Sequence, residues 1–109
     1  MKHDLADVVL QNDSLATALA SLDPRWTFDG TGDVSSLQAE FCFPSFIQAF
    51  AFMTQVALEA EKMDHHPDWS NAYGRVQIRL STHDAGGVTQ RDVYLARRID
   101  AINTDPGPL

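Results

Sequence analysis

The sequence predicts an α+β domain in which helices pack on one face of an antiparallel sheet. Two segments, residues 37–43 and 73–82, alternate polar and apolar side chains with period 2, as strands with one buried face do. Residues 46–62 instead carry apolar side chains at helical spacing. Strands and helices follow one another without regular β-α-β alternation, which favours an antiparallel sheet over a parallel one.

The N-terminal part is expected to form a helix followed by the first arm of a hairpin. Leucines recur at helical spacing over residues 14–22, with Asp13 or Ser14 as the N-cap. An Asp-Pro pair ends this helix, because the residue before a proline avoids the helical conformation. Residues 26–28 are predicted to form a short strand, which the glycine-containing turn 29–33 joins to the strand 37–43.

The central helix is predicted to follow Pro44 and to run to about Lys62. Its main apolar stripe comprises Phe46, Phe50, Met53, Ala57 and Ala60, and Ile47, Val56 and Leu58 widen it. Because most of the circumference is apolar, we expect this helix to be covered both by its own sheet and by a neighbouring subunit.

The C-terminal half begins with a loop at residues 64–68, where the helical pattern breaks. The strand 73–82 follows, and the pattern leaves open whether residues 69–72 add a fourth strand. A turn at 84–87 leads into the closing segment.

A capping-box pattern from Thr89 to Asp92 predicts the start of the last helix. Asp92 takes the N3 position, which Glu or Gln usually holds. Val93, Ala96 and Ile99 then line one face of the helix. The two ends of the chain, residues 1–13 and 103–109, are expected to be loosely ordered.

Composition narrows the function classes. The 109 residues fit a single domain, 1–109. A net charge of -7 repels phosphate backbones and anionic lipids, so we expect neither direct nucleic-acid binding nor membrane association. Cys42 is the only cysteine, so no internal disulfide can form; this fits a cytoplasmic location, and we expect its side chain to be small and half-buried.

Three histidines are the candidates for chemistry. His65 and His66 are adjacent in the loop before Pro67, and His83 directly follows a strand. Imidazole suits proton transfer in both directions near neutral pH, and a nearby carboxylate can fix its tautomer. Because adjacent residues in extended backbone point apart, we expect His65 and His66 to face different groups.

Each candidate residue also has an explanation that requires no function. A loop histidine is commonly only solvated, and Trp69 is as well explained as core or as a lid on a pocket. Asp92 is accounted for by helix capping, and Arg91 by a solvated first turn. A zinc site is the rival chemistry, but neither H-x3-5-H nor H-E-x-x-H spacing occurs, so we expect no metal.

Taken together, these motifs resemble the pterin-4a-carbinolamine dehydratases. The resemblance covers roughly residues 25–102 and is most specific in the His-His-Pro loop followed at a set distance by Ser-Thr-His. The segments that carry it are Glu61–Trp69, Tyr73, Leu80–Asp84, Gly87, Arg91–Asp92 and the helical stretch Phe46–Leu58. Asp84 stands where many members of that family have glutamate.

The resemblance implies a four-stranded antiparallel sheet with three helices on one face, in the order α-β-β-α-β-β-α. It implies a homodimer or homotetramer with no cofactor. It also implies a reaction: 4a-hydroxytetrahydrobiopterin, left by an aromatic amino-acid hydroxylase in the same pathway, loses water to give quinonoid dihydropterin, which serves tetrahydrobiopterin recycling.

The resemblance further assigns site residues. His65 and His83 would be the acid–base pair, and His66 would hold the pterin ring. The pterin pocket would be lined by Asp64, Ser81, Thr82 and Asp84 in addition to the histidines. Glu61, Trp69, Arg91 and Asp92 are second-rank candidates for the pocket or its support.

A second hypothesis is a non-catalytic interaction module, because some relatives resemble dimerisation partners of a transcription factor, or coactivator-like regulators. The histidines discriminate the two hypotheses. A chain that only binds partners has no reason to keep His65, His66 and His83 together, and this chain has all three.

Overall fold

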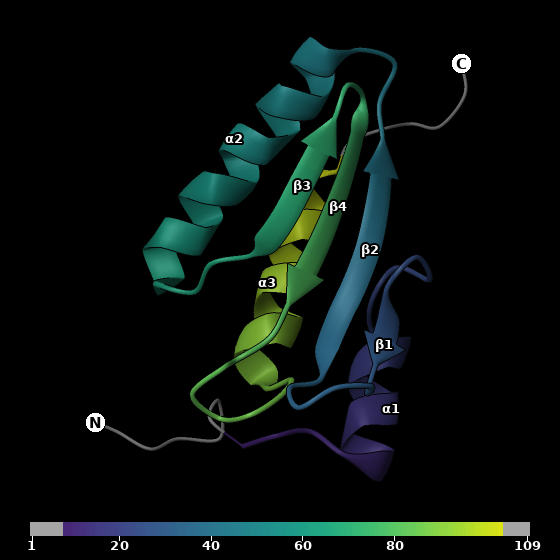
Figure 1. Cartoon of the computed structure of the whole chain (residues 1–109), viewed down its shortest axis with the longest axis vertical. Helices are drawn as coiled ribbons and strands as arrows, with labels where there is room; N and C mark the ends of the chain where they lie inside the picture. The colour runs from purple at the N-terminus through teal and green to yellow at the C-terminus, as the bar shows by residue number, and fades with distance from the viewer. Residues whose placement is uncertain (1–7, 104–109) are drawn as a thin grey trace.

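The computed structural model describes residues 8–103, and its elements follow the predicted order (Figure 1). They are α1 (Asn12–Ala20), β1 (Thr27–Asp29), β2 (Ser36–Cys42), α2 (Phe46–Met63), β3 (Asp68–Ala72), β4 (Arg75–Leu80) and α3 (Gln90–Ile102). The predicted α+β class is confirmed, and β3 resolves the open question of a fourth strand. The predictions for residues 1–7 and 104–109 lie outside the described part.

The four strands form one antiparallel sheet in the order β1-β2-β4-β3. Leu37 pairs with Leu80 at one end of the central strand pair, and Cys42 pairs with Arg75 at the other. Along β4 the side chains alternate between exposed and buried. One face of the sheet is therefore covered by the helices, and the opposite face is polar and open.

The core lies between the sheet and α2 and α3. Phe41 is fully buried and packs against the rings of Trp26 and Phe52, at centroid distances of 6.0 and 4.9 Å. Val93, Ala96 and Ile99 of α3 are all buried, as their spacing predicts. No helix in residues 8–103 is long and apolar enough to cross a membrane.

The predicted stripe of α2 faces the core only in part, with Ala60 buried and Met53 half-buried. The buried residues of α2 are Ala49, Phe52, Val56 and Ala60, whereas Phe46, Phe50 and Ala57 of the predicted stripe are exposed. The helix is apolar around most of its circumference, so spacing alone could not choose between its faces. The other apolar face, which includes Phe46 and Phe50, is left exposed by residues 8–103.

Three local predictions were wrong. Helix α1 begins at Asn12, and Ser14 caps it from inside the first turn, its Oγ accepting from the N–H of Gln11 at 3.1 Å. Cys42 is exposed rather than half-buried, because it lies on the open face of β2.

The predicted strand 73–82 is shorter, since Tyr73 and Gly74 form the β3–β4 turn. A Cβ at Gly74 would overlap the carbonyl oxygen of Phe43.

Candidate active site

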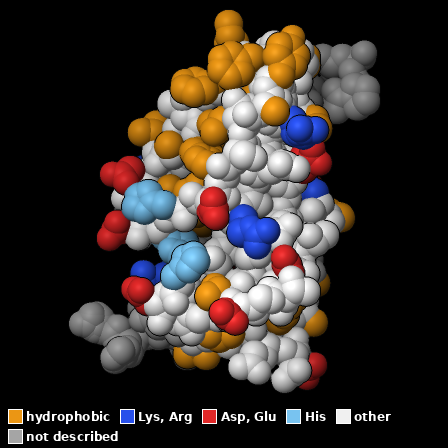
Figure 2. All heavy atoms as spheres, in the orientation of Figure 1, with side chains coloured by type: hydrophobic (Ala, Val, Ile, Leu, Met, Phe, Trp, Pro, Cys, Tyr) orange, Lys and Arg blue, Asp and Glu red, His pale blue; other side chains and the backbone are white. Residues whose placement is uncertain are grey.

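The three histidines lie at one end of the sheet, where α2 ends, β3 begins, β4 ends and α3 begins. Figure 2 shows the histidine side chains near one another on this face, flanked by acidic and basic side chains. The segments are far apart in sequence but meet because β3 and β4 are antiparallel neighbours and α3 packs beside α2.

Asp64 turns the chain from α2 into the histidine loop. Its backbone is left-handed, with φ 51°, and its N–H donates to the carbonyls of Ala60 and Glu61. The N–H of His65 also donates to Ala60, at 3.1 Å. These bonds satisfy the last turn of the helix and direct the following residues toward α3. Asp64 thus has a helix-ending role in addition to the pocket role expected of it.

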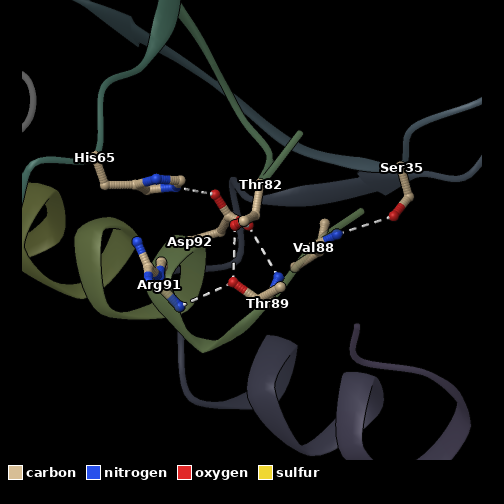
Figure 3. Close-up of polar contacts among 7 residues, drawn as sticks. All are labelled: Ser35, His65, Thr82, Val88, Thr89, Arg91 and Asp92. Atoms are coloured by element: carbon tan, nitrogen blue, oxygen red, sulfur yellow. Dashed lines mark hydrogen bonds and ion pairs between the residues drawn. The ribbon is translucent and has the colours of Figure 1, made fainter. Parts of the chain in front are cut away.

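His65 is buried and is bonded to Asp92. Its Nε2 lies 2.6 Å from Oδ1 of Asp92, a residue at the first turn of α3 with no exposed surface (Figure 3). A histidine held by a buried carboxylate has a fixed ring orientation. The structure therefore joins His65, which is expected to be one of the acid–base pair, to Asp92, a second-rank candidate for the pocket or its support.

The other oxygen of Asp92 accepts two more hydrogen bonds. Its Oδ2 lies 2.9 Å from the hydroxyl of Thr82 and 2.9 Å from the N–H of Thr89. The two threonine hydroxyls are 2.8 Å apart. The capping box predicted at Thr89 and Asp92 is confirmed, and the same carboxylate also holds the histidine.

His66 faces solvent and has a different carboxylate partner. Its Nε2 lies 2.5 Å from Oε1 of Glu61, in the last turn of α2, and both side chains are exposed. His65 and His66 therefore point to different groups, as predicted for adjacent residues in this loop. Exposure leaves His66 accessible to a ligand.

His83 lies in the tight turn after β4. Its carbonyl accepts from the N–H of Gly86, while its side chain is exposed and makes no hydrogen bond within residues 8–103. Ser81 is half-buried and Asp84 is exposed. These three residues follow β4 closely, and a bridge between Thr82 and Gly87 closes the turn.

Two second-rank candidates have structural explanations. Trp69 is half-buried, pairs with Ile78 in the sheet and packs against the core. Arg91 is half-buried in the first turn of α3, and its N–H donates to the hydroxyl of Thr89 at 3.2 Å.

Two residues that support the site, Thr89 and Ser35, were not predicted to do so from the sequence. The buried hydroxyl of Thr89 bonds the hydroxyl of Thr82, whereas the capping pattern had indicated only a helix cap. Ser35 accepts from the N–H of Val88 at 3.1 Å and so ties the β1–β2 loop to the segment before α3 (Figure 3). Within the described residues, no group of three or more His, Cys, Asp or Glu side chains has the geometry of a metal site.

An ion pair beside the site fixes α2 against α3. Arg98 lies 3.3 Å from Glu59, and its hydrogen bond holds the pKa of Glu59 below the usual value. This pair joins the two helices whose ends carry Glu61 and Asp92, the carboxylates that orient the two loop histidines.

Residues 8–102 match the family model described as "Pterin 4 alpha carbinolamine dehydratase". A protein of Rhizorhabdus wittichii is 52% identical over 93 residues, which cover 85% of this chain and 93% of that protein. A protein of Mesorhizobium japonicum is 52% identical over 91 residues, covering 84% of this chain and 90% of that protein. The names of both assign pterin-4-alpha-carbinolamine dehydratase provisionally.

Two solved structures have a similar fold. A crystal structure from Brucella melitensis, described as a transcriptional coactivator/pterin dehydratase, has a TM-score of 0.80 and 42% identity, covering 86% of this chain and 97% of that one. A pterin dehydratase-like protein identified as a RuBisCO assembly factor in the alpha-carboxysome has a TM-score of 0.61 and 26% identity, covering 72% of this chain and 89% of that one.

Proposed function

Because this chain belongs to the pterin 4 alpha carbinolamine dehydratase family, we propose that it is a hydro-lyase that dehydrates 4a-hydroxytetrahydrobiopterin to quinonoid dihydropterin. One observation carries the proposal: two adjacent histidines, each bonded to its own carboxylate, lie at the end of the sheet where His83 is exposed. This set can move protons in both directions and also hold a small heterocycle.

The reaction needs an acid and a base. Hydroxide is a poor leaving group, so an acid must protonate the 4a-hydroxyl as its carbon–oxygen bond breaks. A base must accept the proton of the neighbouring ring nitrogen as the new double bond forms. His65 and His83 are proposed to share these two tasks.

The remaining residues are proposed to bind the pterin. His66 would hold the ring, because it is exposed and its imidazole is oriented by Glu61. Ser81 and Asp84 flank the two sides of His83 and would contact the pterin through side-chain or backbone hydrogen bonds. The proposal includes an aromatic amino-acid hydroxylase as the source of the substrate, and a role in tetrahydrobiopterin recycling in the cytoplasm.

A homodimer or homotetramer is proposed to form through the uncovered face of α2. Phe46, Ile47 and Phe50 are 48%, 77% and 55% exposed. Figure 2 shows apolar side chains gathered at this end of the molecule. An exposed aromatic and aliphatic cluster of this kind is unfavourable in water and is typical of an interface between chains.

A second candidate function is regulation through a protein partner. It is favoured by the same apolar face of α2 and by the solved relatives described as a coactivator and as an assembly factor. The two functions would use different surfaces, since the histidines lie at the opposite end of α2 from Phe46. A change at one surface should therefore leave the other intact.

The deciding experiment follows the decay of enzymatically generated 4a-hydroxytetrahydrobiopterin by absorbance. We expect the wild-type chain to accelerate it, and His65→Ala, His66→Ala and His83→Ala to lose most of that acceleration while remaining folded. Gln77→Ala, an exposed change on the open face of the sheet, is the control. Decay at the spontaneous rate with wild-type protein would exclude the dehydratase and leave the regulatory function.

A further inference from the structure

The hydrogen bonds that surround Asp92 have defined directions. Thr82 donates its hydroxyl hydrogen to Oδ2 of Asp92 at 2.9 Å. A hydroxyl has only one hydrogen to donate, so the 2.8 Å bond between the two threonines must be donated by Thr89. The hydroxyl of Thr89 in turn accepts from the N–H of Arg91 at 3.2 Å. Each hydrogen in this series of bonds, whose contacts are drawn in Figure 3, is therefore donated in the direction of Asp92.

This arrangement determines which nitrogen of His65 carries a hydrogen. Oδ2 of Asp92 accepts from Thr82 and Thr89, which leaves Oδ1 for Nε2 of His65 at 2.6 Å. A carboxylate has no hydrogen to give, so Nε2 is the donor. In neutral His65 the lone pair is then on Nδ1, which accepts no hydrogen bond from the described residues 8–103.

This hydrogen-bond network is well protected from water. Thr89 and Asp92 have no exposed surface and Thr82 is 6% exposed, and no buried side-chain polar atom in the described residues lacks a partner. A buried group that loses its partner cannot recover a hydrogen bond from solvent. Removing one hydroxyl should therefore loosen the whole hydrogen-bond network around Asp92.

We propose that Thr82 and Thr89 are positioning residues that hold the carboxylate of Asp92 in place, so that Asp92 keeps His65 in one tautomer and one ring orientation. The two hydroxyls fix the carboxylate of Asp92, and Asp92 holds the Nε2–H of His65, so Nδ1 is the nitrogen available for proton transfer. The tautomer follows from the geometry alone, whereas its consequence for turnover rests on the proposed dehydratase function.

A purely structural role makes a different prediction. If Thr89 only caps α3 and Thr82 only fills space, removing a hydroxyl changes stability but not the protonation pattern of His65. The readout must therefore be the histidine ring itself.

The test is a two-bond proton–nitrogen correlation spectrum of the imidazoles in the full 15N-labelled chain, with His65 assigned as the signal that is lost in His65→Gln. Thr82→Val removes the hydroxyl with little change in shape, and Thr82→Ser keeps it. Thr31→Val is the matched control, because the exposed Thr31 also donates its hydroxyl to an aspartate, Asp29.

We expect a single Nε2–H tautomer of His65 in wild type, Thr82→Ser and Thr31→Val. In Thr82→Val we expect a second tautomer and about tenfold faster exchange of the Nε2 hydrogen, the change expected from the loss of one hydrogen bond. One tautomer in Thr82→Val, with exchange within about threefold of wild type, would overturn the proposal.

A second variant covers the case in which Thr82→Val does not fold. Thr89→Gly removes the other hydroxyl but keeps the backbone N–H that donates to Asp92, so its His65 spectrum is then judged by the same criteria. In the dehydration assay, Thr82→Val should lower kcat about tenfold with KM nearly unchanged. If wild type shows no dehydration, the proposed function fails, and the tautomer result still decides the roles of the two threonines.

Discussion

Replacing Asp92 by asparagine should reverse the tautomer of His65. The amide oxygen of Asn must face the donors of Thr82 and Thr89, which now hold Oδ2 at 2.9 Å each. The amide NH2 group then occupies the position of Oδ1, 2.6 Å from Nε2 of His65. Since an amide NH2 can only donate, Nε2 must accept and the ring hydrogen must move to Nδ1.

The size of the effect follows from these contacts. A proton-transfer group contributes about 10²–10⁴ to a rate, so the loss of the correct tautomer should lower kcat by about two to four orders of magnitude. Three hydrogen bonds to a charged carboxylate become bonds to a neutral amide, which should cost about 1–3 kcal/mol of unfolding free energy. For a domain of this size, this is a fall of about 4–8 °C in Tm for each kcal/mol.

The assay combines pterin dehydration, imidazole nitrogen spectra and thermal unfolding. Glu40→Gln is the matched control, because Glu40 is an exposed carboxylate on the open sheet face, 3.6 Å from Arg75. It should leave both the tautomer and kcat unchanged. An Asp92→Asn protein that keeps the Nε2–H tautomer and wild-type kcat would show that Asp92 does not set the protonation pattern of His65.

Three further predictions concern the fold and its surfaces. Gly74→Ala should lower the unfolding free energy by about 2 kcal/mol or more, because the new Cβ meets the carbonyl oxygen of Phe43; unchanged chemical denaturation would contradict the close approach seen there. Phe50→Glu should shift the mass measured by light scattering toward the monomer while dehydration continues, and an unchanged mass would exclude α2 as the interface. The bond from Arg98 lowers the pKa of Glu59, so its stabilisation is present above the usual value of 4.5 and is lost as the pH falls through the folded pKa. Glu59→Gln should therefore weaken the fall of Tm with acidification in this range, and parallel pH profiles would argue against a contribution from the pair.

The strands and helices were largely predictable because their patterns are local. Period-2 alternation identified β2 and β4, and the capping box identified the start of α3. The orientation of α2 was not predictable from spacing, because both the Phe52 face and the Phe50 face are apolar. Only the packing of the sheet shows that Phe52 is buried at 4% exposure and Phe50 is not.

The histidines were identifiable from sequence, but their partners were not. His65 and Asp92 are separated by 27 positions, and their bond depends on how the α2–β3 loop meets the first turn of α3. Thr82 was expected to line the pterin pocket, yet its hydroxyl is directed at Asp92 and Thr89. Such a network depends on tertiary packing, which no short sequence pattern encodes.

The most direct test of the central claim is the initial rate of loss of 4a-hydroxytetrahydrobiopterin at increasing concentrations of wild-type protein. If the chain is a dehydratase, the rate rises above the spontaneous rate in proportion to protein concentration, with quinonoid dihydropterin formed in equal amount. A rate independent of protein concentration would contradict the dehydratase function.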